Sequence, residues 1–331
     1  MKVSILIPTL NRQALLRESL NSARRQTHGD IEILVSDNGS TDRTREFVAE
    51  VTAIDPRVRL LTTNPIPEMV SNFNHLIQQS RGDAFCFLPD DDRLLPQFVE
   101  TLLAPLAAAP DLVASFCDHW IITTAGERLP ESSERHSRHY GRLDLPAGRI
   151  ADPLTIALHQ SLTVPFTLYR ASALRHELLD ETCGGAADVD YGIRVARAGG
   201  LYYVDERLAE YRVHAGMTTA TRTAFMIDGA IRAYSKHSFP DASHEQLRRR
   251  ILRSRYLVKA IYTCTRSRTE WWESVRMYRR TGGSLAHPRF LLSCGLAMLP
   301  QGAGEAMRGW LKAVRRRVIP RVTSRDHPEA N

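Results

Sequence analysis

Cysteines are few in this chain, and no two of them lie close together. The five cysteines are spread from Cys86 to Cys294 and form no C-x-x-C pair. This spacing argues against both a disulfide framework and a zinc site. We therefore expect reduced and mostly buried thiols.

Long apolar runs are also missing. No stretch reaches the roughly 18 apolar residues that a membrane-spanning helix needs, and residues 290–299 come nearest to it. The apolar start at residues 3–10 is too short and too poorly flanked for a signal peptide. We expect a cytoplasmic globular protein, because 331 residues with 43% hydrophobic content can bury a sizeable core.

Acidic residues are scarce in the last part of the chain. From Asp241 to the end there are 19 Lys and Arg residues against 7 Asp and Glu, whereas the first 240 residues carry 25 against 30. A mildly acidic body is therefore followed by a basic C-terminal region. Such a region indicates an anionic partner, either a membrane surface or a nucleic acid.

The first hundred residues are rich in strand-like runs that alternate with segments of helical spacing. The predicted strands are 3–8, 31–35, 58–61 and 84–89, and the predicted helices between them are 13–26, 42–51 and 68–80. This alternation predicts an α/β fold with a mainly parallel, Rossmann-like sheet and helices on both faces.

The pattern changes twice in the rest of the chain. Residues 126–152 are polar and lack periodicity, so we expect a long loop there. Beyond residue 221 the pattern is helical, with candidate helices at 223–236, 245–266, 270–278 and 303–319. We place one domain at 1–220, with halves of about 1–110 and 111–220, and a basic helical region at 221–331.

Polar residues follow three of the predicted strands at the point where each strand ends: residues 8–12, 36–40 and 89–92. Ligands of open parallel sheets bind beyond the carboxyl ends of the strands, so these segments should face one crevice. The third segment contains three aspartates in a row. Adjacent carboxylates repel unless their charge is taken up, and such oxygen ligands suit Mg²⁺ or Mn²⁺. The alternative is that one aspartate caps the following helix while the others are solvated.

Five segments in this order resemble motifs of the family-two glycosyltransferases, which have the GT-A fold. The segments are 3–12, 33–42, 90–92, 188–194 and 211–216. In the same order, they are similar to the opening strand with its nucleotide loop, the second loop, the metal-binding D-x-D motif, the segment of the catalytic base, and a segment whose histidine often completes the metal site. The resemblance covers roughly residues 3–216.

The resemblance implies roles for individual residues. The nucleotide sugar would be bound by Pro8, Thr9, Asn11, Arg12, Asp37, Asp90 and Asp91. A divalent cation, Mn²⁺ or Mg²⁺, would be held by Asp91, Asp92 and His214, and Asp188 would be the catalytic base. The plainer interpretation of Asp188 is a helix N-cap, and that of His214 is a histidine of the surface or core.

The sequence departs from the family pattern at two positions. Ala187 stands where many relatives have a glutamate before the base, and Pro89 stands where many have an acidic residue. The second difference leaves open which two of Asp90, Asp91 and Asp92 take the ribose and metal roles.

The resemblance thus implies an inverting, metal-dependent glycosyltransferase of hexosyltransferase type. It would move a sugar from a UDP-linked donor to the hydroxyl of a glycan or lipid-linked glycan, in the assembly of cell-surface polysaccharide or glycolipid. One alternative is a nucleotidyltransferase that makes nucleotide sugars, but residues 8–12 contain no glycine for a triphosphate loop. Another is a non-catalytic nucleotide or nucleic-acid binding module. Nucleic acid is disfavoured because the motifs are acidic and the tail has no recognised binding motif.

The segment 303–319 has an apolar stripe that includes Trp310, and basic residues occupy much of the remainder. Such a helix can lie on an anionic bilayer, which would bring the protein to the inner face of the cell membrane. The alternative is that the stripe packs on the chain's own helices.

Overall fold

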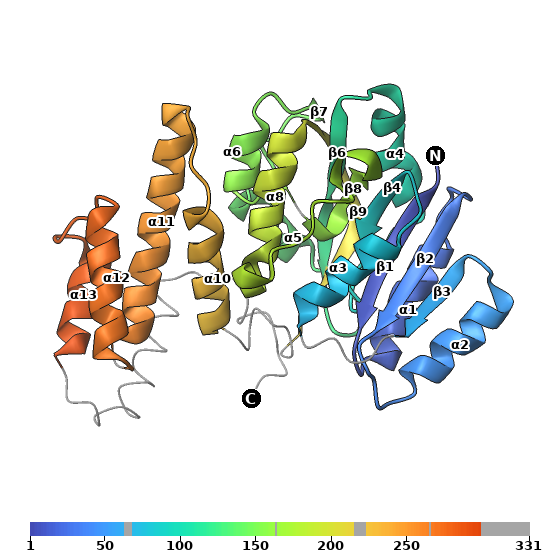
Figure 1. Ribbon diagram of the computed structural model, residues 1–331, viewed down its shortest axis with the longest axis horizontal. Coiled ribbons are helices and arrows are strands. Elements are labelled where there is room, and N and C mark those ends of the chain that lie inside the picture. The colour runs from blue at the N-terminus through green and yellow to red at the C-terminus, as the bar shows by residue number, and fades with distance from the viewer. Residues whose placement is uncertain (63–67, 163, 215–222, 265, 299–331) are drawn as a thin grey trace. The chain divides into compact units, whose positions relative to one another are not determined.

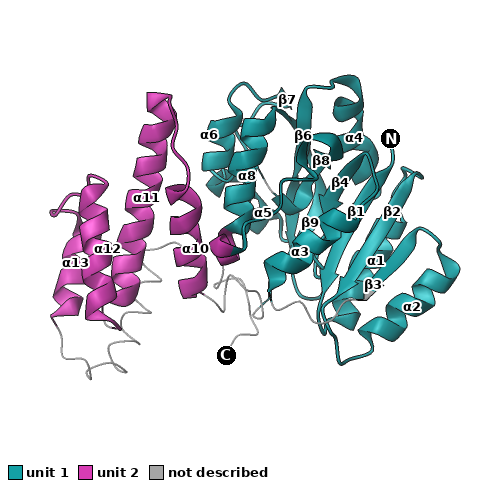
Figure 2. Ribbon diagram, viewed as in Figure 1, with its two compact units in different colours: residues 1–181, 187–214 teal, residues 182–186, 215–331 magenta. Residues whose placement is uncertain are grey.

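The computed structural model describes residues 1–62, 68–162, 164–214, 223–264 and 266–298 (Figure 1). The chain divides into two compact units, which Figure 2 shows in separate colours. Unit 1 consists of residues 1–181 and 187–214, and unit 2 of residues 182–186 and 215–331. The sheet belongs to unit 1, whereas unit 2 is helical in its described residues.

Unit 1 is built on one sheet of nine strands within the described residues. The strands are β1 (Val3–Thr9), β2 (Ile31–Asp37), β3 (Val58–Thr62), β4 (Ala84–Phe87), β5 (Arg93–Leu94), β6 (Leu112–Ile122), β7 (Gly148–Arg149), β8 (Thr167–Arg170) and β9 (Gly200–Arg212). Their order is β3-β2-β1-β4-β8-β6-β9-β5, with β7 paired to β9. The pairs among β1 to β4 and the pair β6–β9 are parallel, while β5, β7 and β8 run antiparallel to their neighbours.

Helices cover both faces of this sheet. They are α1 (Gln13–Arg24), α2 (Thr44–Ile54), α3 (Met69–Gln79), α4 (Phe98–Ala108), α5 (Pro130–His139), α6 (Pro153–Leu158), α7 (Ala171–Leu174) and α8 (Ala187–Ala198), with a short turn η1 (Val164–Phe166). The buried core on one face contains residues of α1, α2 and α4, such as Leu16 and Phe98. On the near face in Figure 1, Phe73 of α3 and Tyr191 of α8 meet Phe87 of β4 edge to face. The predicted α/β class with helices on both faces is confirmed.

The register of the strands brings three strand ends to one edge of the sheet. Thr9, the last residue of β1, pairs with Asp37, the last residue of β2. On the other side of β1, Leu6 pairs with Phe87 at the end of β4. Thr9 lies three residues after Leu6, and Asp90 lies three residues after Phe87, just beyond the end of β4. These two residues therefore meet at the carboxyl edge although they are far apart in the chain.

The region 126–152 differs from the sequence-based prediction of a long loop, because it contains helix α5 and strand β7. The buried face of α5 carries serines rather than apolar residues. Ser133 Oγ accepts a hydrogen bond from the backbone nitrogen of Ile121, and Ser137 Oγ donates to the carboxylate of Asp118. Hydrophobic periodicity cannot reveal a helix that is held to the sheet by hydroxyl groups.

A buried polar cluster lies between α5 and β6. Arg142 donates from Nε to Asp118 Oδ1 at 2.8 Å and from Nη2 to His136 Nδ1 at 3.1 Å. Arginine can only donate, so His136 Nδ1 is an unprotonated acceptor and the ring is neutral. His119 Nε2 lies 3.2 Å from the same atom. Burial, followed by the charge of Arg142, lowers the pKa of His136 to about 3 and that of His119 well below its ordinary value.

The chain is expected to lose stability as the pH falls below about 6.5. Unfolded histidines take up a proton near that pH, whereas His119 and His136 stay neutral in the folded chain. The loss amounts to at most about 1.4 kcal/mol per pH unit for each histidine and levels off only where the folded state also binds the proton. Melting temperatures across this range should fall less steeply for His136→Asn than for the wild type. His176→Asn, at an exposed position, should keep the wild-type slope, and equal slopes in all three proteins would contradict the prediction.

Unit 2 contains four α-helices in its described residues. They are α10 (Thr223–Ser235), α11 (Ala242–Thr263), α12 (Arg268–Arg280) and α13 (Pro288–Ala297), and most of the turn η2 (Glu181–Ala186) belongs to this unit as well. Helices α10, α11 and α12 confirm predicted helices. No helix was predicted over α13, where the sequence has an apolar run. The predicted helix at 303–319 lies outside the described residues. None of the described helices is both long and apolar enough to span a membrane.

Candidate active site

Asp90, the first of the three aspartates after β4, joins two of the loops at the carboxyl edge. Thr9 Oγ1 donates to Asp90 Oδ2 at 2.8 Å, and Arg12 Nη1 donates to Asp90 Oδ1 at 3.0 Å. The same Nη1 lies 2.9 Å from Asp91 Oδ2. One guanidinium thus bridges two neighbouring carboxylates and ties the loop after β1 to the loop after β4.

Asp91 also contacts His214, which lies two residues past the end of β9. His214 Nε2 is 3.0 Å from Asp91 Oδ2, and the two side chains are only 14% and 15% exposed. Burial by itself raises the pKa of the Asp91 carboxyl, but the hydrogen bond from His214 and the charge of Arg12 outweigh it and lower the pKa. Asp91 is therefore ionised at neutral pH.

Asp92 is the most deeply buried of the three aspartates, at 1% exposure. Its Oδ1 accepts a hydrogen bond from the backbone nitrogen of Arg212 at 2.8 Å, and its Oδ2 is buried without a hydrogen-bond partner. Burial, and next the charge of Asp91, raise the pKa of Asp92 well above its ordinary value. A buried oxygen without a donor costs free energy, so a cation beside it would be favourable.

Three residues of this cluster, Asp91, Asp92 and His214, supply ligand types that suit a divalent cation. Burial, and next the charge of Asp91, raise the pKa of Asp90 to about 6 in spite of Arg12. Carboxylate oxygens with one imidazole nitrogen form a donor set that Mn²⁺ and Mg²⁺ accept. Asp91, Asp92 and His214 are the residues that could hold such an ion.

The loops after β1 and β2 are hydrogen-bonded into one surface. Asn11 has a positive φ of 53°, a left-handed conformation that asparagine tolerates. Its Oδ1 accepts from Thr41 N at 2.7 Å, and its backbone nitrogen donates to Ser40 Oγ at 2.8 Å. Asp37 is completely buried and accepts from Ser40 N at 3.0 Å and from Arg45 Nε at 2.5 Å. Asp37 therefore holds this loop in shape.

Asp188 lies in the first turn of α8, one residue after the helix begins at Ala187. Its Oδ1 accepts from the backbone nitrogen of Val189 at 2.9 Å. Solvent reaches the side chain, but the surrounding protein atoms still desolvate the carboxyl and raise its pKa. Asp190, by contrast, is fully buried and paired with Arg194 at 3.0 Å. Of the two aspartates, Asp188 is the one that a substrate can approach.

The Tyr211 hydroxyl is affected by the charges of both Asp188 and the aspartate cluster. Burial raises the pKa of the Tyr211 hydroxyl, and the charges of Asp92, Asp91 and Asp188 raise it further. Each of the three carboxylates thus lies within electrostatic range of the Tyr211 hydroxyl. Within the described residues no hydrogen bond joins Asp188 to the cluster.

The structure brings most of the predicted site residues together. Thr9, Arg12, Asp90, Asp91, Asp92 and His214 form one connected cluster. Asn11 and Asp37 lie in the adjoining loops, and Pro8 pairs with Ser36 one position before the end of β1.

Two residues of this region were not predicted from the sequence, Arg212 and Glu18. Arg212 Nη2 donates to Glu18 Oε2 at 2.6 Å. The only signal for Arg212 is its place in the segment 211–216, two residues before His214. Glu18 lies within a predicted amphipathic helix, and nothing in the local pattern distinguishes it.

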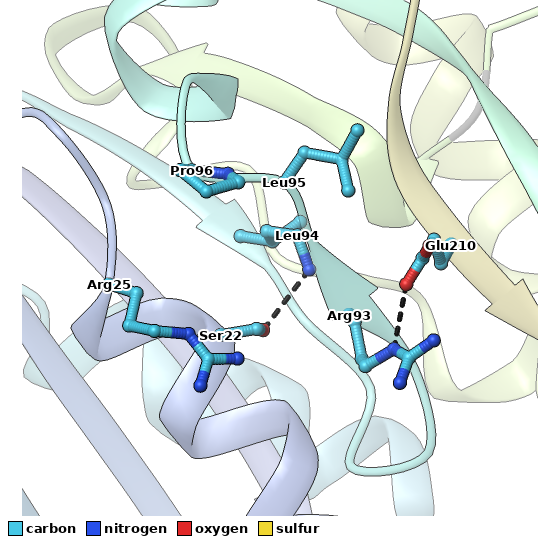
Figure 3. A pocket seen from close by; sticks show the side chains of 7 residues that line it. All are labelled: Ser22, Arg25, Arg93, Leu94, Leu95, Pro96 and Glu210. Atoms are coloured by element: carbon cyan, nitrogen blue, oxygen red, sulfur yellow. Dashed lines mark hydrogen bonds and ion pairs between the residues drawn. The ribbon is translucent and has the colours of Figure 1, made fainter. Parts of the chain in front are cut away.

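A small cavity of about 160 Å³ lies beside β5 (Figure 3). It is lined by Ser22, Arg25, Arg93, Leu94, Leu95, Pro96 and Glu210. Figure 3 shows the ion pair from Arg93 Nε to Glu210 Oε2, 2.7 Å long, at its side. The cavity is smaller than typical small-molecule pockets of a few hundred Å³, and no predicted site residue lines it. It is therefore not a site for a nucleotide sugar.

The fold is similar to that of two structures that were solved with a bound nucleotide sugar. The structure of S. aureus TarS 1–349 in complex with UDP-GlcNAc matches with a TM-score of 0.67, at 14% identity, over 90% of this chain and 88% of that chain. The mannosyltransferase PcManGT from Pyrobaculum calidifontis, in complex with GDP-Man and Mn²⁺, matches with a TM-score of 0.59, at 15% identity, over 95% and 86% of the two chains. At this identity the likeness establishes the fold alone, and it confirms the GT-A prediction.

Relatives in sequence are also glycosyltransferases by name. The GalNAc(5)-diNAcBac-PP-undecaprenol beta-1,3-glucosyltransferase of Campylobacter jejuni is 37% identical over 103 residues, which are 31% of this chain and only 33% of that protein. An uncharacterized glycosyltransferase of Haemophilus influenzae is 25% identical over 230 residues, 66% of this chain and 67% of its own length. The model of the family described as "Glycosyl transferase family 2" matches residues 4–176, just over half of the chain. The chain belongs to glycosyl transferase family 2.

Proposed function

We propose that this glycosyltransferase is inverting and metal-dependent and transfers a sugar from a UDP-linked donor to an acceptor hydroxyl. The observation that carries the proposal is the cluster of Asp90, Asp91 and Asp92, in which a buried carboxylate oxygen has no partner. The basic side chains of Arg12 and His214 flank that cluster. Such a site accommodates a cation together with the diphosphate of a nucleotide sugar.

The donor would lie along the loops that follow β1, β2 and β4. The nucleotide sugar would be bound by Pro8, Thr9, Asn11, Arg12, Asp37, Asp90 and Asp91. Arg12 already bridges two carboxylates, and a guanidinium is suited to bind a phosphate oxygen as well. UDP is our choice of nucleotide because the structurally similar TarS was solved with UDP-GlcNAc.

The cation would be Mn²⁺ or Mg²⁺, held by Asp91, Asp92 and His214. The imidazole nitrogen favours Mn²⁺, because Mg²⁺ keeps more strictly to oxygen ligands. When bound, the ion would neutralise charge on the departing nucleoside diphosphate.

Asp188 would act as the base. The acceptor oxygen attacks the anomeric carbon, the bond between that carbon and the diphosphate oxygen breaks, and the hydroxyl proton passes to the Asp188 carboxylate. Its raised pKa makes Asp188 a better proton acceptor than an ordinary aspartate. Attack on the face opposite the leaving group inverts the anomeric centre.

We assign the donor site to residues 1–110, the acceptor site to 111–220, and contact with an anionic membrane to the segment 303–319 of the basic region 221–331. The name of the Campylobacter relative includes a polyprenyl-linked glycan. We infer a glycan or lipid-linked glycan acceptor for this chain, handled at the cytoplasmic face of the membrane in polysaccharide or glycolipid assembly.

A panel of nucleotide sugars tests the proposal, with release of the nucleoside diphosphate as the readout, with and without a lipid extract. We expect release from a UDP-sugar with Mn²⁺ or Mg²⁺, and a loss of at least ~100-fold after demetallation in chelator. Full turnover in chelator would reject metal dependence. A product whose proton coupling constant shows retained anomeric configuration would reject inversion.

Two described helices of unit 2 support the membrane assignment. Trp272 of α12 is 58% exposed, and Arg268, Arg276 and Arg279 share its side of the helix, being four or seven positions away. Leu291 of α13 is 56% exposed. A basic surface with an exposed tryptophan suits an anionic lipid headgroup region.

Flotation with liposomes should show binding to anionic lipid, little binding to neutral lipid, and loss of binding in high salt, because the attraction is largely electrostatic. A chain cut after Gln301, which lacks the segment 303–319, should bind much less. Full-length protein that stays at the bottom of the gradient in every lipid rules out peripheral attachment.

A further inference from the structure

We propose that Arg212 is a positioning residue that holds Asp91 and Asp92 in the geometry that receives the cation: its buried guanidinium binds the backbone oxygen of Asp91, and its backbone nitrogen binds the Asp92 carboxylate. This inference rests on the metal-dependent function proposed above. It assigns Arg212 no contact with substrate, and its effect passes through the two aspartates.

Arg212 binds residues 90–92, called the aspartate turn below, at two points: through its backbone and through its side chain. The backbone nitrogen donates to Asp92 Oδ1 at 2.8 Å, and Nε donates to the backbone oxygen of Asp91 at 2.8 Å. The Arg212 side chain is 0% exposed. The backbone hydrogen bond occupies Oδ1 and leaves the other Asp92 oxygen without a partner, while the guanidinium fixes the adjoining backbone at Asp91.

The far end of the same guanidinium is anchored to two other segments. Nη1 donates to the backbone oxygens of Thr123 and Thr124 at 3.2 and 2.7 Å, and Nη2 donates to Glu18 Oε2 on α1 at 2.6 Å. All three guanidinium nitrogens therefore have partners, which a buried cation requires. The aspartate turn is thereby fixed to α1 and to the end of β6.

Glu18 also connects Arg212 to the ion pair between Arg93 and Glu210 beside the small cavity. Arg93 Nη1 lies 3.1 Å from Glu18 Oε2. Arg93 Nε lies 2.7 Å from Glu210 Oε2, a pair that Figure 3 shows. Arg93 directly follows Asp92 in the chain, so the turn is held on both sides. Arg212 also stands two residues before His214, and fixing the end of β9 aligns that histidine with Asp91.

Lysine cannot replace arginine in this position. Four hydrogen bonds reach partners in different directions from one planar group, whereas an ammonium is a single point with three donors. A lysine would keep the positive charge near Glu18 but would lose the fixed spacing between the aspartate turn and residues 123–124. Residues that orient metal ligands typically change metal affinity by about 10–100-fold when they are altered.

The experiment measures Mn²⁺ affinity of the purified full-length protein by calorimetry and by the loss of the free-ion electron paramagnetic resonance signal, without turnover. We expect Arg212→Lys to weaken Mn²⁺ binding by about 10–100-fold. The matched control is Arg170→Lys. Arg170 also donates to three backbone oxygens, those of Leu112, Ala109 and Leu106, but lies away from the cluster. It should lose comparable melting temperature and keep wild-type Mn²⁺ affinity.

A second variant covers the case in which Arg212→Lys fails to fold. Glu18 is 42% exposed on its side chain and alanine is a good helix former, so Glu18→Ala should fold. It should weaken Mn²⁺ binding by several-fold, on the order of the lower end of the range for orienting residues. Glu50→Ala, exposed on α2, should not.

The outcomes separate this inference from the proposed function. If Arg212→Lys or Glu18→Ala binds Mn²⁺ as tightly as the wild type, or if Arg170→Lys weakens binding equally, the positioning role is wrong while metal dependence stands. If the wild type itself binds neither Mn²⁺ nor Mg²⁺ in the presence of UDP, the proposed metal dependence fails and the inference fails with it.

Discussion

Asp92→Asn is expected to cut turnover by at least ~100-fold while the melting temperature stays unchanged or rises slightly. The loss of turnover follows because an amide oxygen binds a divalent cation far more weakly than a carboxylate. The retained stability follows from the raised pKa of Asp92: a group that is hard to ionise in the folded state costs stability above its unfolded pKa, and the neutral amide removes that cost. Initial rates at saturating donor, together with thermal melts, measure both effects.

The matched control for this prediction is Asp55→Asn. Asp55 is also buried, but hydrogen bonds from Arg57, and next from Arg24, lower its pKa. A carboxyl with a lowered pKa contributes stability at neutral pH, so this variant should melt earlier and keep its turnover. If Asp92→Asn instead melts earlier and remains active, the aspartate turn is structural and the proposed cation site is wrong.

Asp188→Asn is expected to lose transfer by about 10²–10⁴-fold while binding the nucleoside diphosphate as the wild type does. The amide cannot take the acceptor's proton, yet it keeps the size and the hydrogen bond to Val189 N. Calorimetric titration with UDP and single-turnover transfer separate the two properties. The loss should appear in kcat rather than in donor affinity.

Asp190→Asn is the natural comparison for that variant. Asp190 lies two positions further along α8 and is buried in an ion pair with Arg194. Neutralising it should lower the melting temperature, because Arg194 loses a charged partner. Loss of UDP binding in a well-folded Asp188→Asn protein would move Asp188 into the donor site, and unaltered transfer would remove it from the mechanism.

Much of the fold could be predicted from the sequence because the patterns that mark strands and helices are local. Strands buried on both faces must be continuous apolar runs, and the helices between them must carry one apolar stripe, so the order of elements from β1 to α4 follows from composition and period. The same order implies a shared carboxyl edge, and Thr9, Asp37 and Asp90 lie at that edge.

The prediction of a long loop over residues 126–152 was wrong at helix α5, where the buried side chains are polar. Helix α5 is attached through serine hydroxyls and faces a cluster of Asp118, His136 and Arg142, so its inner face has no hydrophobic period. The long strand β9 is also hard to recognise in the sequence, because Asp205 and Glu206 interrupt its apolar residues. Its pairing with β6 has an irregular register near that point, and this irregularity allows one strand to pass through the charged residues.

By itself, the sequence determined the class of the fold, the edge at which the site lies and the residue types that gather there, since these depend on short-range patterns. Only the tertiary structure shows that Asp92 Oδ2 has no hydrogen-bond partner and that Asp92 Oδ1 accepts a hydrogen bond from the backbone nitrogen of Arg212. Asp92 and Arg212 belong to different segments, and their hydrogen bond exists because β5 pairs with β9 in one register. Local patterns carry no information on such long-range registers, which arise only when the whole sheet packs.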